Sequence, residues 1–205
     1  MGANRLAALT GVGFVVLLIA GGAIAGQPPN PSDDSVQEII DFYTDNDTSI
    51  WIGTIMQILA AASLIFFGGY LRKIFEAAAG PGHMLSAVVL VGAAIVAVGG
   101  AIDATINVTL VESVDDIEPD AVQALSALWN NDFLPLGLGA FVFALASGLS
   151  ILRHGALPKW LGWVAVVLAV AIMTPAGFAG IIGTALWILV VSIILALREG
   201  KATTT

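Results

Sequence analysis

The chain has no cysteine and few charged residues, and both shortages restrict what it can be. Without cysteine there are no disulfides, no thiolate nucleophile and no zinc site built on thiolate ligands. Only 11% of the 205 residues are charged and 58% are hydrophobic, whereas a soluble domain carries about 25% charged residues. Most of the chain therefore has no water to face, which indicates an integral membrane protein.

Long apolar runs divide the chain into six predicted membrane spans. The last run, from Trp160 to Leu197, contains no charged residue. As one helix it would be about 57 Å long, whereas the hydrocarbon core of a bilayer is about 30 Å thick. It must therefore fold back, and we expect the turn at Thr174-Pro175-Ala176-Gly177, because proline cannot continue a helix and glycine permits a tight turn. The predicted spans cover residues 6–26, 50–71, 84–108, 133–152, 158–174 and 178–197.

Charged residues sort to opposite ends of these spans. The seven basic residues, which fall on one side, are Arg5, Arg72, Lys73, Arg153, Lys159, Arg198 and Lys201. Twelve of the fifteen acidic residues fall on the other side, in or beside loops 27–49 and 109–132. The positive-inside rule then places both termini in the cytoplasm and both acidic loops outside the plasma (inner) membrane. The prediction is an all-α, multi-pass membrane helix bundle, one transmembrane domain over residues 1–205 with three in–out–in hairpins.

The start of the chain allows two interpretations. Ala23 and Ala25 form the A-x-A pattern of a signal peptidase site, after a basic start at Arg5 and an apolar run. Cleavage after Ala25 would leave five spans with the same sidedness. The apolar run from Leu6 to Ala25 is longer than the about 7–15 residues of a signal-peptide h-region, which favours a first helix that is retained.

Each acidic loop is predicted to contain a short amphipathic helix. The apolar faces consist of Val36, Ile39, Ile40 and Tyr43 in the first loop and of Val122, Leu125 and Trp129 in the second. Pro119 is well placed to begin the second helix. We expect both helices to lie on the outer surface or to pack over the bundle. The two loops also resemble each other, which fits either an internal duplication or convergence under the same topological demands.

Small residues predict where the spans approach one another, because close packing in lipid requires short side chains. These residues are Gly22 and Gly26 in span one, Gly92, Ala93, Ala97, Gly99, Ala101 and Ala104 in span three, and Ala140, Ala144 and Gly148 in span four. The favoured interpretation is a set of helix-contact faces. A ligand groove lined by glycine is the alternative.

One polar constellation lies inside the predicted spans. Asp103 is the only ionisable residue well within a span, where a charge costs about 2.5–3.5 kcal/mol at mid-helix. Asn107 follows it by four residues and shares its helical face, and Thr54 and Gln57 share a face of span two at a similar depth. We expect the four side chains to form one cluster that opens outward. It is either a structural hydrogen-bonded group or a binding site for a small polar or cationic solute.

Other chemistry is scarce in this sequence. It has no Ser-His-Asp arrangement, no phosphate-binding loop and no lysine within a span, so we expect neither an enzyme nor a cofactor. His83 and His154 flank loops on the basic side, where Glu76 is the only acidic residue close to them in the predicted arrangement. A metal site is therefore not predicted.

The segment from Gly139 to Val170 resembles a broad bacterial family of six-span membrane proteins of unknown function. The resemblance is carried by Arg153 at the end of a span, by the loop Gly-Ala-Leu-Pro at residues 155–158, and by Leu161-Gly162 at the start of the next span. It implies six spans in a bacterial plasma membrane. It implies no activity.

These observations lead to three functional hypotheses. The favoured one is a non-enzymatic accessory, sensory or interaction module, embedded in the lipid bilayer, whose partner is another membrane protein or a second copy of itself; nucleic acid is not an expected partner. It predicts a closed bundle without a continuous cavity. The alternative is a transporter or binder of a small solute, which predicts a vestibule that reaches Asp103. An intramembrane enzyme would need a catalytic set that the sequence does not contain.

Overall fold

The computed structural model describes residues 2–202, and every regular element among them is an α-helix. The helices are α1 (Ala3–Ala25), α2 (Val36–Asp45), α3 (Asp47–Ala79), α4 (Met84–Ser113), α5 (Pro119–Asn131), α6 (Phe133–His154), α7 (Lys159–Ile172) and α8 (Gly177–Ala202). Five stretches are long and apolar enough to cross a membrane: α1, α3, α4, α8 and the nearly continuous pair α5–α6. The protein is therefore all-helical and has the helices of a multi-pass membrane protein, as expected.

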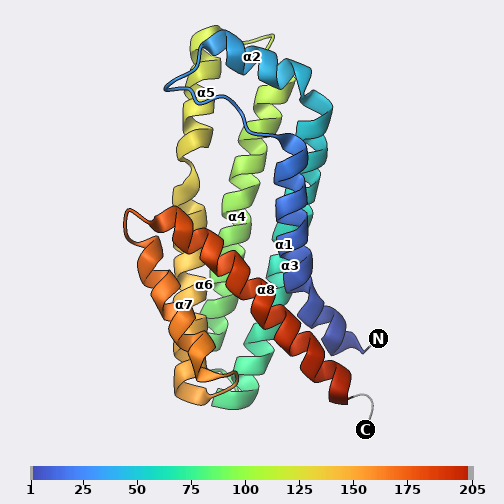
Figure 1. Ribbon diagram of the computed structural model, residues 1–205, viewed down its shortest axis with the longest axis vertical. Coiled ribbons are helices and arrows are strands. Elements are labelled where there is room, and N and C mark those ends of the chain that lie inside the picture. Colours follow the sequence, from blue (N-terminus) through green and yellow to red (C-terminus); the bar gives the residue numbers. More distant parts are fainter. Residues whose placement is uncertain (1, 203–205) are drawn as a thin grey trace.

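Six helices form a closed ring around the axis of the bundle. Successive neighbours in the ring are α1, α3, α4, α6, α7 and α8, and α8 packs back onto α1. In Figure 1, α3, α4 and α6 stand upright, whereas α8 crosses the bundle obliquely toward the end that carries both termini. Hydrogen bonds help to tie α8 into the ring. Among them, Ser192 donates to the Ala8 carbonyl at 2.5 Å, and the Trp187 indole donates to the Leu161 carbonyl at 2.9 Å.

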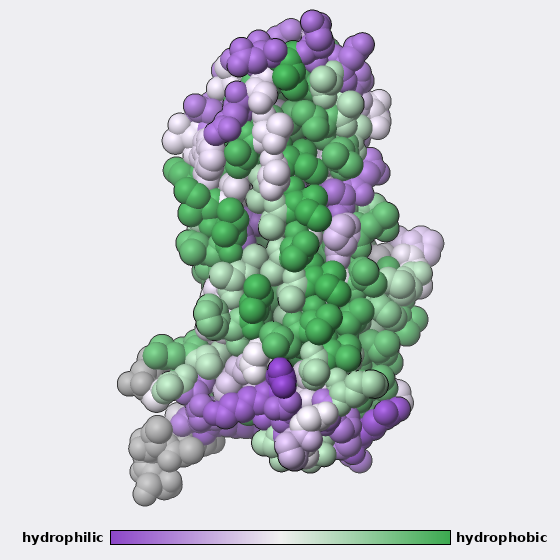
Figure 2. Space-filling model, turned by 180° about the vertical axis from the view of Figure 1, so that it is seen from behind, coloured by the Kyte–Doolittle hydropathy of each residue, from purple (hydrophilic) through white to green (hydrophobic). Residues whose placement is uncertain are grey.

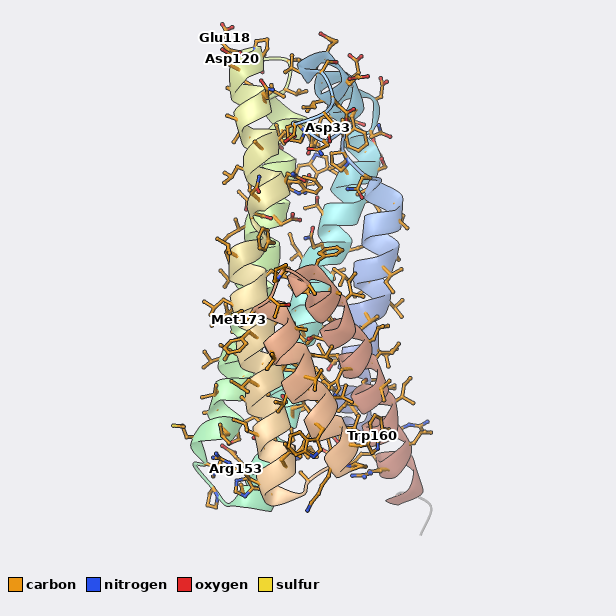
Figure 3. The ribbon with its side chains drawn as sticks, turned by 60° about the vertical axis from the view of Figure 1, so that its left-hand side comes forward. Asp33, Glu118, Asp120, Arg153, Trp160 and Met173 are labelled. Atoms are coloured by element: carbon orange, nitrogen blue, oxygen red, sulfur yellow. The ribbon has the colours of Figure 1, made fainter. Side chains whose placement is uncertain are left out.

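The last two helices match the expectation only in part. The chain reverses between Ile172 and Gly177, where the fold-back was predicted. However, α7 has only 14 residues, so it is about 21 Å long, against about 30 Å for a hydrocarbon core. Figure 3 shows Met173, at the turn, part-way along the molecule between the acidic and the basic ends. The fold-back is confirmed, but a sixth helix of full membrane-spanning length is not.

Short helices occupy both acidic segments, and they are oriented differently. Figure 1 shows α2 lying across one end of the bundle, whereas α5 continues almost in line with α6. The break before α3 is the single residue Asn46, and the break before α6 is the single residue Asp132. At the start of α2, the Ser35 amide donates to the Glu38 carboxylate at 2.7 Å and the Glu38 amide donates to the Ser35 hydroxyl at 3.3 Å, which forms a capping box.

The predicted apolar faces of α2 and α5 are the faces that pack. Ile39, Tyr43 and Val122 are fully buried in a cluster with residues of α3 and α4. The remaining members of the two faces pack against the same cluster: Val36, Ile40, Leu125 and Trp129. This second core holds the two short helices onto the ends of α3 and α4.

Glycine allows α4 and α6 to touch backbone to backbone. A Cβ atom on Gly92 would lie 2.5 Å from the amide nitrogen of Phe143, and one on Gly139 would lie 2.4 Å from that of Val96. Both distances are too short for any side chain. Gly92 and Gly99 were predicted contact residues, and each meets the α6 backbone.

Two of the predicted contact residues are not contacts. A Cβ on Gly22 would have nothing within 4 Å, whereas one on the preceding Gly21 would lie 3.0 Å from the Gly53 carbonyl of α3. Consecutive residues of a helix are about 100° apart, so an error of one residue points to a different neighbour. Ala101 is exposed, whereas Ala93, Ala97 and Ala104 of the same predicted stripe are buried.

An apolar band separates two polar ends of the molecule (Figure 2). The basic end joins the start of α1, the α6–α7 loop and the last turns of α3 and α8, since Lys73 donates to Asn4 at 3.1 Å and Arg198 donates to the Ala156 carbonyl at 3.3 Å. The acidic end consists of α2, α5 and the segments around them, and includes Asp33, Glu118 and Asp120 in Figure 3. The side chain of Lys201 lies outside the described part of the chain.

The contact between α4 and α6 gives a first prediction. We expect Gly139→Ala to destabilise the protein by about 1–3 kcal/mol, because the new methyl group meets the α4 backbone rather than a flexible side chain. The matched control is Gly69→Ala on α3, where an added Cβ has nothing within 4 Å. The control should be neutral or stabilising by up to about 1 kcal/mol. Equilibrium unfolding in detergent micelles measures both, and equal stabilities would contradict the backbone contact.

Candidate functional site

The structure brings the four polar residues of α3 and α4 together. The side-chain amide of Gln57 donates to the Asp103 carboxylate at 2.6 Å, and the side-chain amide of Asn107 donates to the backbone carbonyl of Asp103 at 3.3 Å. Thr54, Gln57, Asp103 and Asn107 all line one cavity of about 150 Å³, here called the polar cavity. They converge because α3 and α4 are antiparallel neighbours, and positions at similar depth therefore lie side by side.

The other walls of the polar cavity come from α1, α2 and α5. The end of α1 contributes Gly22, which makes no helix contact and leaves space beside Asp103, and Gly26, which follows the helix and faces the ring of Phe42. Pro28 and Phe42 contribute from the segment after α1 and from α2. Gly53 of α3 lines the cavity as well, and a ligand groove lined by glycine stays a prediction.

Tyr43 fastens α2 to the cluster. Its hydroxyl donates to the Asn107 side-chain carbonyl at 3.2 Å, and its ring is fully buried. Asn107 thereby accepts from α2 while its amide donates to the backbone of its own helix. Burial raises the pKa of the Tyr43 hydroxyl, and the negative charge of Asp103 raises it further by a smaller amount. The phenol therefore stays a neutral hydrogen-bond donor under physiological conditions.

Trp129 in the cavity wall and Asp132 close to Asp103 are two further residues at the site, and the sequence pattern does not predict either there. Trp129 lines the polar cavity beside Asp103, and its indole nitrogen is buried with no hydrogen-bond partner of normal geometry among residues 2–202. Asp132 lies close enough for its charge to interact with that of Asp103, and one of its oxygens is likewise buried and unpartnered within the described chain. Both residues reach the site because α5 runs in line with α6, which the sequence pattern does not reveal.

Thr54 adds a further unused polar group. Its side chain is only 4% exposed, and it faces the polar cavity from α3. The hydroxyl makes no hydrogen bond to any described residue. Because Thr54 faces the polar cavity, this wall is suited to a ligand or to ordered water.

A second, apolar cavity adjoins the polar one. It has a volume of about 90 Å³ and lies in the centre of the helix ring, among α1, α3, α4, α6 and α8; it is here called the apolar chamber. Leu18 and Gln57 line both cavities, so the two meet at these side chains. The chamber exists because alanine and glycine face the centre of the ring from several helices.

At the basic end, the structure brings His83 and His154 together. Their ring centroids are 4.4 Å apart, in an edge-to-face arrangement. His83 Nδ1 and His154 Nε2 are both buried, and neither has a hydrogen-bond partner in the described chain. The sequence pattern does not predict this pairing, because His83 precedes α4 and His154 ends α6. Within residues 2–202, no group of three or more potential ligands from His, Cys, Asp and Glu could hold a metal ion.

Comparisons with known proteins add no relative to this picture. The chain matches none of the known protein families, and no match was found among curated proteins or among solved structures. What the polar cavity can bind is therefore inferred from its own atoms.

The raised pKa of Tyr43 gives a second prediction. The chain has two tyrosines, so in Tyr70→Phe the phenolate absorbance reports Tyr43 alone. Because the folded-state pKa lies above the ordinary 10.0, the stability that neutral Tyr43 contributes is full below that pH and is lost as the pH rises through the folded pKa. We expect no phenolate near pH 10.0 while the protein is folded.

The denatured variant is the control for this titration, and it should ionise near the ordinary value. A phenolate that forms there with the helical circular dichroism unchanged would show that Tyr43 is open to water.

Proposed function

We propose that this protein is a multi-pass membrane protein that binds an organic ammonium ion in the polar cavity. The observation that carries the proposal is the position of Asp103, a carboxylate inside a helix bundle, in a cavity that has aromatic walls and no basic residue. The two acidic segments, residues 27–49 and 109–132, contain no lysine or arginine.

Charge supports a cationic ligand. A carboxylate within a membrane helix is costly unless it is paired or hydrogen-bonded. Gln57 satisfies one oxygen of Asp103 without neutralising its charge, and the nearby Asp132 adds a second negative charge. A bound ammonium ion would compensate one of these two charges and reduce the repulsion between them. The acidic surface around α2 and α5 would also raise the local concentration of cations at the mouth of the cavity.

The size of the polar cavity supports an organic cation over a metal ion. A cavity of about 150 Å³ is large enough to hold a benzene molecule. A calcium ion takes oxygen ligands at about 2.3–2.6 Å and would leave most of this space empty. An ammonium group with a few carbon substituents has about the right volume.

The aromatic walls support the same class of ligand. Trp129 and Phe42 line the polar cavity together with Asp103. Aromatic faces attract ammonium groups by about 0.5–2 kcal/mol, and tryptophan is the most effective. The hydroxyl of Thr54 and the side chain of Asn107 provide hydrogen bonds for a polar substituent of the ligand.

This proposal favours the second hypothesis from the sequence over the first. An accessory module predicts a closed bundle without a continuous cavity, whereas a solute binder predicts a vestibule that reaches Asp103. The support for the second is that Asp103 lines the polar cavity. A role for a partner protein or for a second copy of the chain stays a prediction, and so does the absence of enzymatic activity.

We also propose that the acidic end faces outward and the basic end faces the cytoplasm. The support is the positive-inside rule applied to the basic end of the bundle. A bacterial plasma membrane is proposed from the family resemblance of residues 139–170. A cation would then enter the polar cavity from outside, past α2.

The cysteine-free chain allows a direct test of this orientation. We expect Asp41→Cys, exposed on α2, to react in intact cells with a thiol reagent that cannot cross membranes. Ala78→Cys, exposed near the end of α3, should react only after the cells are opened. Reaction of both variants in intact cells would contradict the proposed topology.

Binding of tetramethylammonium tests the function. In a neutral maltoside detergent, which carries no ammonium group, we expect titration calorimetry to detect one binding site per chain. Asp103→Asn should bind at least about tenfold more weakly, which corresponds to about 1.4 kcal/mol. The matched control is Asp41→Asn, which removes the same charge from an exposed position on α2. Equal binding by the two variants would disprove the proposed site.

A further inference from the structure

We propose that the natural ligand is a cationic amphiphile, whose ammonium group occupies the polar cavity and whose apolar chain enters the apolar chamber. This inference rests on the proposed function and adds the class of ligand to it. It follows from the juxtaposition of two cavities of opposite character inside one helix ring.

Gln57 marks the boundary between the two cavities. Its amide donates to Asp103 at 2.6 Å, on the side of the polar cavity. The same side chain also lines the apolar chamber, and Leu18 of α1 likewise lines both cavities. A ligand that passes between Leu18 and Gln57 would move from carboxylate and aromatic surroundings into hydrocarbon ones within the length of one side chain.

The apolar chamber offers nothing to a polar ligand. Its walls include Phe14, Leu64, Phe143 and Ile188. Thr184 also lines it, but the Thr184 hydroxyl already donates to the Gly180 carbonyl at 2.8 Å. Cavities with such walls stay dry and bind apolar groups. The amide of Gln57 is the remaining polar group, and it is directed at Asp103.

The size of the apolar chamber limits the chain that it can take. One water molecule occupies about 30 Å³ of liquid volume, and a methylene group is of similar size. A chamber of about 90 Å³ therefore holds roughly three or four carbon atoms. Side chains that line an empty apolar cavity lack van der Waals contacts on one side, and an alkyl chain in the cavity would supply them.

Position in the ring supports an internal chain over a lipid packed against the outside. The chamber is lined from five helices, α1, α3, α4, α6 and α8. Small side chains hold it open, among them Ala61 on α3, Ala140 on α6 and Ala185 on α8. One larger side chain at any of these positions would fill the chamber without touching Asp103.

A chain-length series in maltoside micelles tests the inference. Tetramethylammonium presents the head alone, and butyltrimethylammonium adds three methylenes. Each buried methylene should tighten binding by about fourfold, so we expect the butyl compound to bind the wild type at least about tenfold more tightly. In Ala185→Leu, tetramethylammonium should bind as in the wild type and the gain from the chain should disappear. The matched control, Ala179→Leu, places the same side chain at an exposed position of α8 and should keep the gain.

The outcomes separate the two proposals. Equal affinities for both compounds in the wild type, or a full gain in Ala185→Leu, would overturn the amphiphile and leave the ammonium site standing. Tetramethylammonium binding that is unaffected by Asp103→Asn would remove the proposed function itself. If Ala185→Leu binds neither compound, Ala61→Leu on α3 fills the same chamber and decides the question by the same comparison.

Discussion

The half-buried carboxylate of Asp103 is the constraint around which the acidic half of the molecule is arranged. A charge inside a membrane helix must be given hydrogen bonds or a counter-charge. The structure supplies the hydrogen bonds from a neighbouring helix, through Gln57, and secures the surroundings through Asn107 and Tyr43. It supplies no counter-charge, because the described basic side chains lie at the opposite end of the bundle. The uncompensated negative charge of Asp103 borders the polar cavity, which has room for a cation.

Backbone geometry makes this space and closes it. Gly21 and Gly53 let α1 and α3 approach closely, so the end of α1 lies beside the cluster. A bend at one residue, Asn46, turns α2 across the bundle, and Phe42 of α2 lines the cavity. The break at Asp132 keeps α5 in line with α6, and Trp129 of α5 also lines the cavity. Two chemically similar segments are therefore used in different ways, one as a cover and one as a wall.

Much of this architecture follows from periodicity and charge, because those patterns are local. The turn near Pro175, the buried faces of α2 and α5, and the meeting of Gln57 with Asp103 all result from residue spacing and depth. The features that could not be predicted from the sequence depend on the angle between helices or on where a helix ends. Helix angles and helix ends decide that Gly21 rather than Gly22 contacts α3 and that α7 is short. They also decide that Trp129 approaches Asp103 and that His83 pairs with His154. Hydropathy carries no information about such angles.

The interior of the helix ring therefore contains a polar cavity next to an apolar one, and Gln57 lines both. A hydrophilic cation would gain from the carboxylate and the aromatic rings but would leave the apolar chamber empty, and a neutral hydrocarbon would fill the chamber but leave Asp103 without a counter-charge. A ligand that suits only the polar cavity or only the apolar chamber therefore binds more weakly than a ligand that suits both. Selectivity for a molecule with both properties then requires no moving part, because it arises from the distance between one carboxylate and a group of alanines in the same bundle.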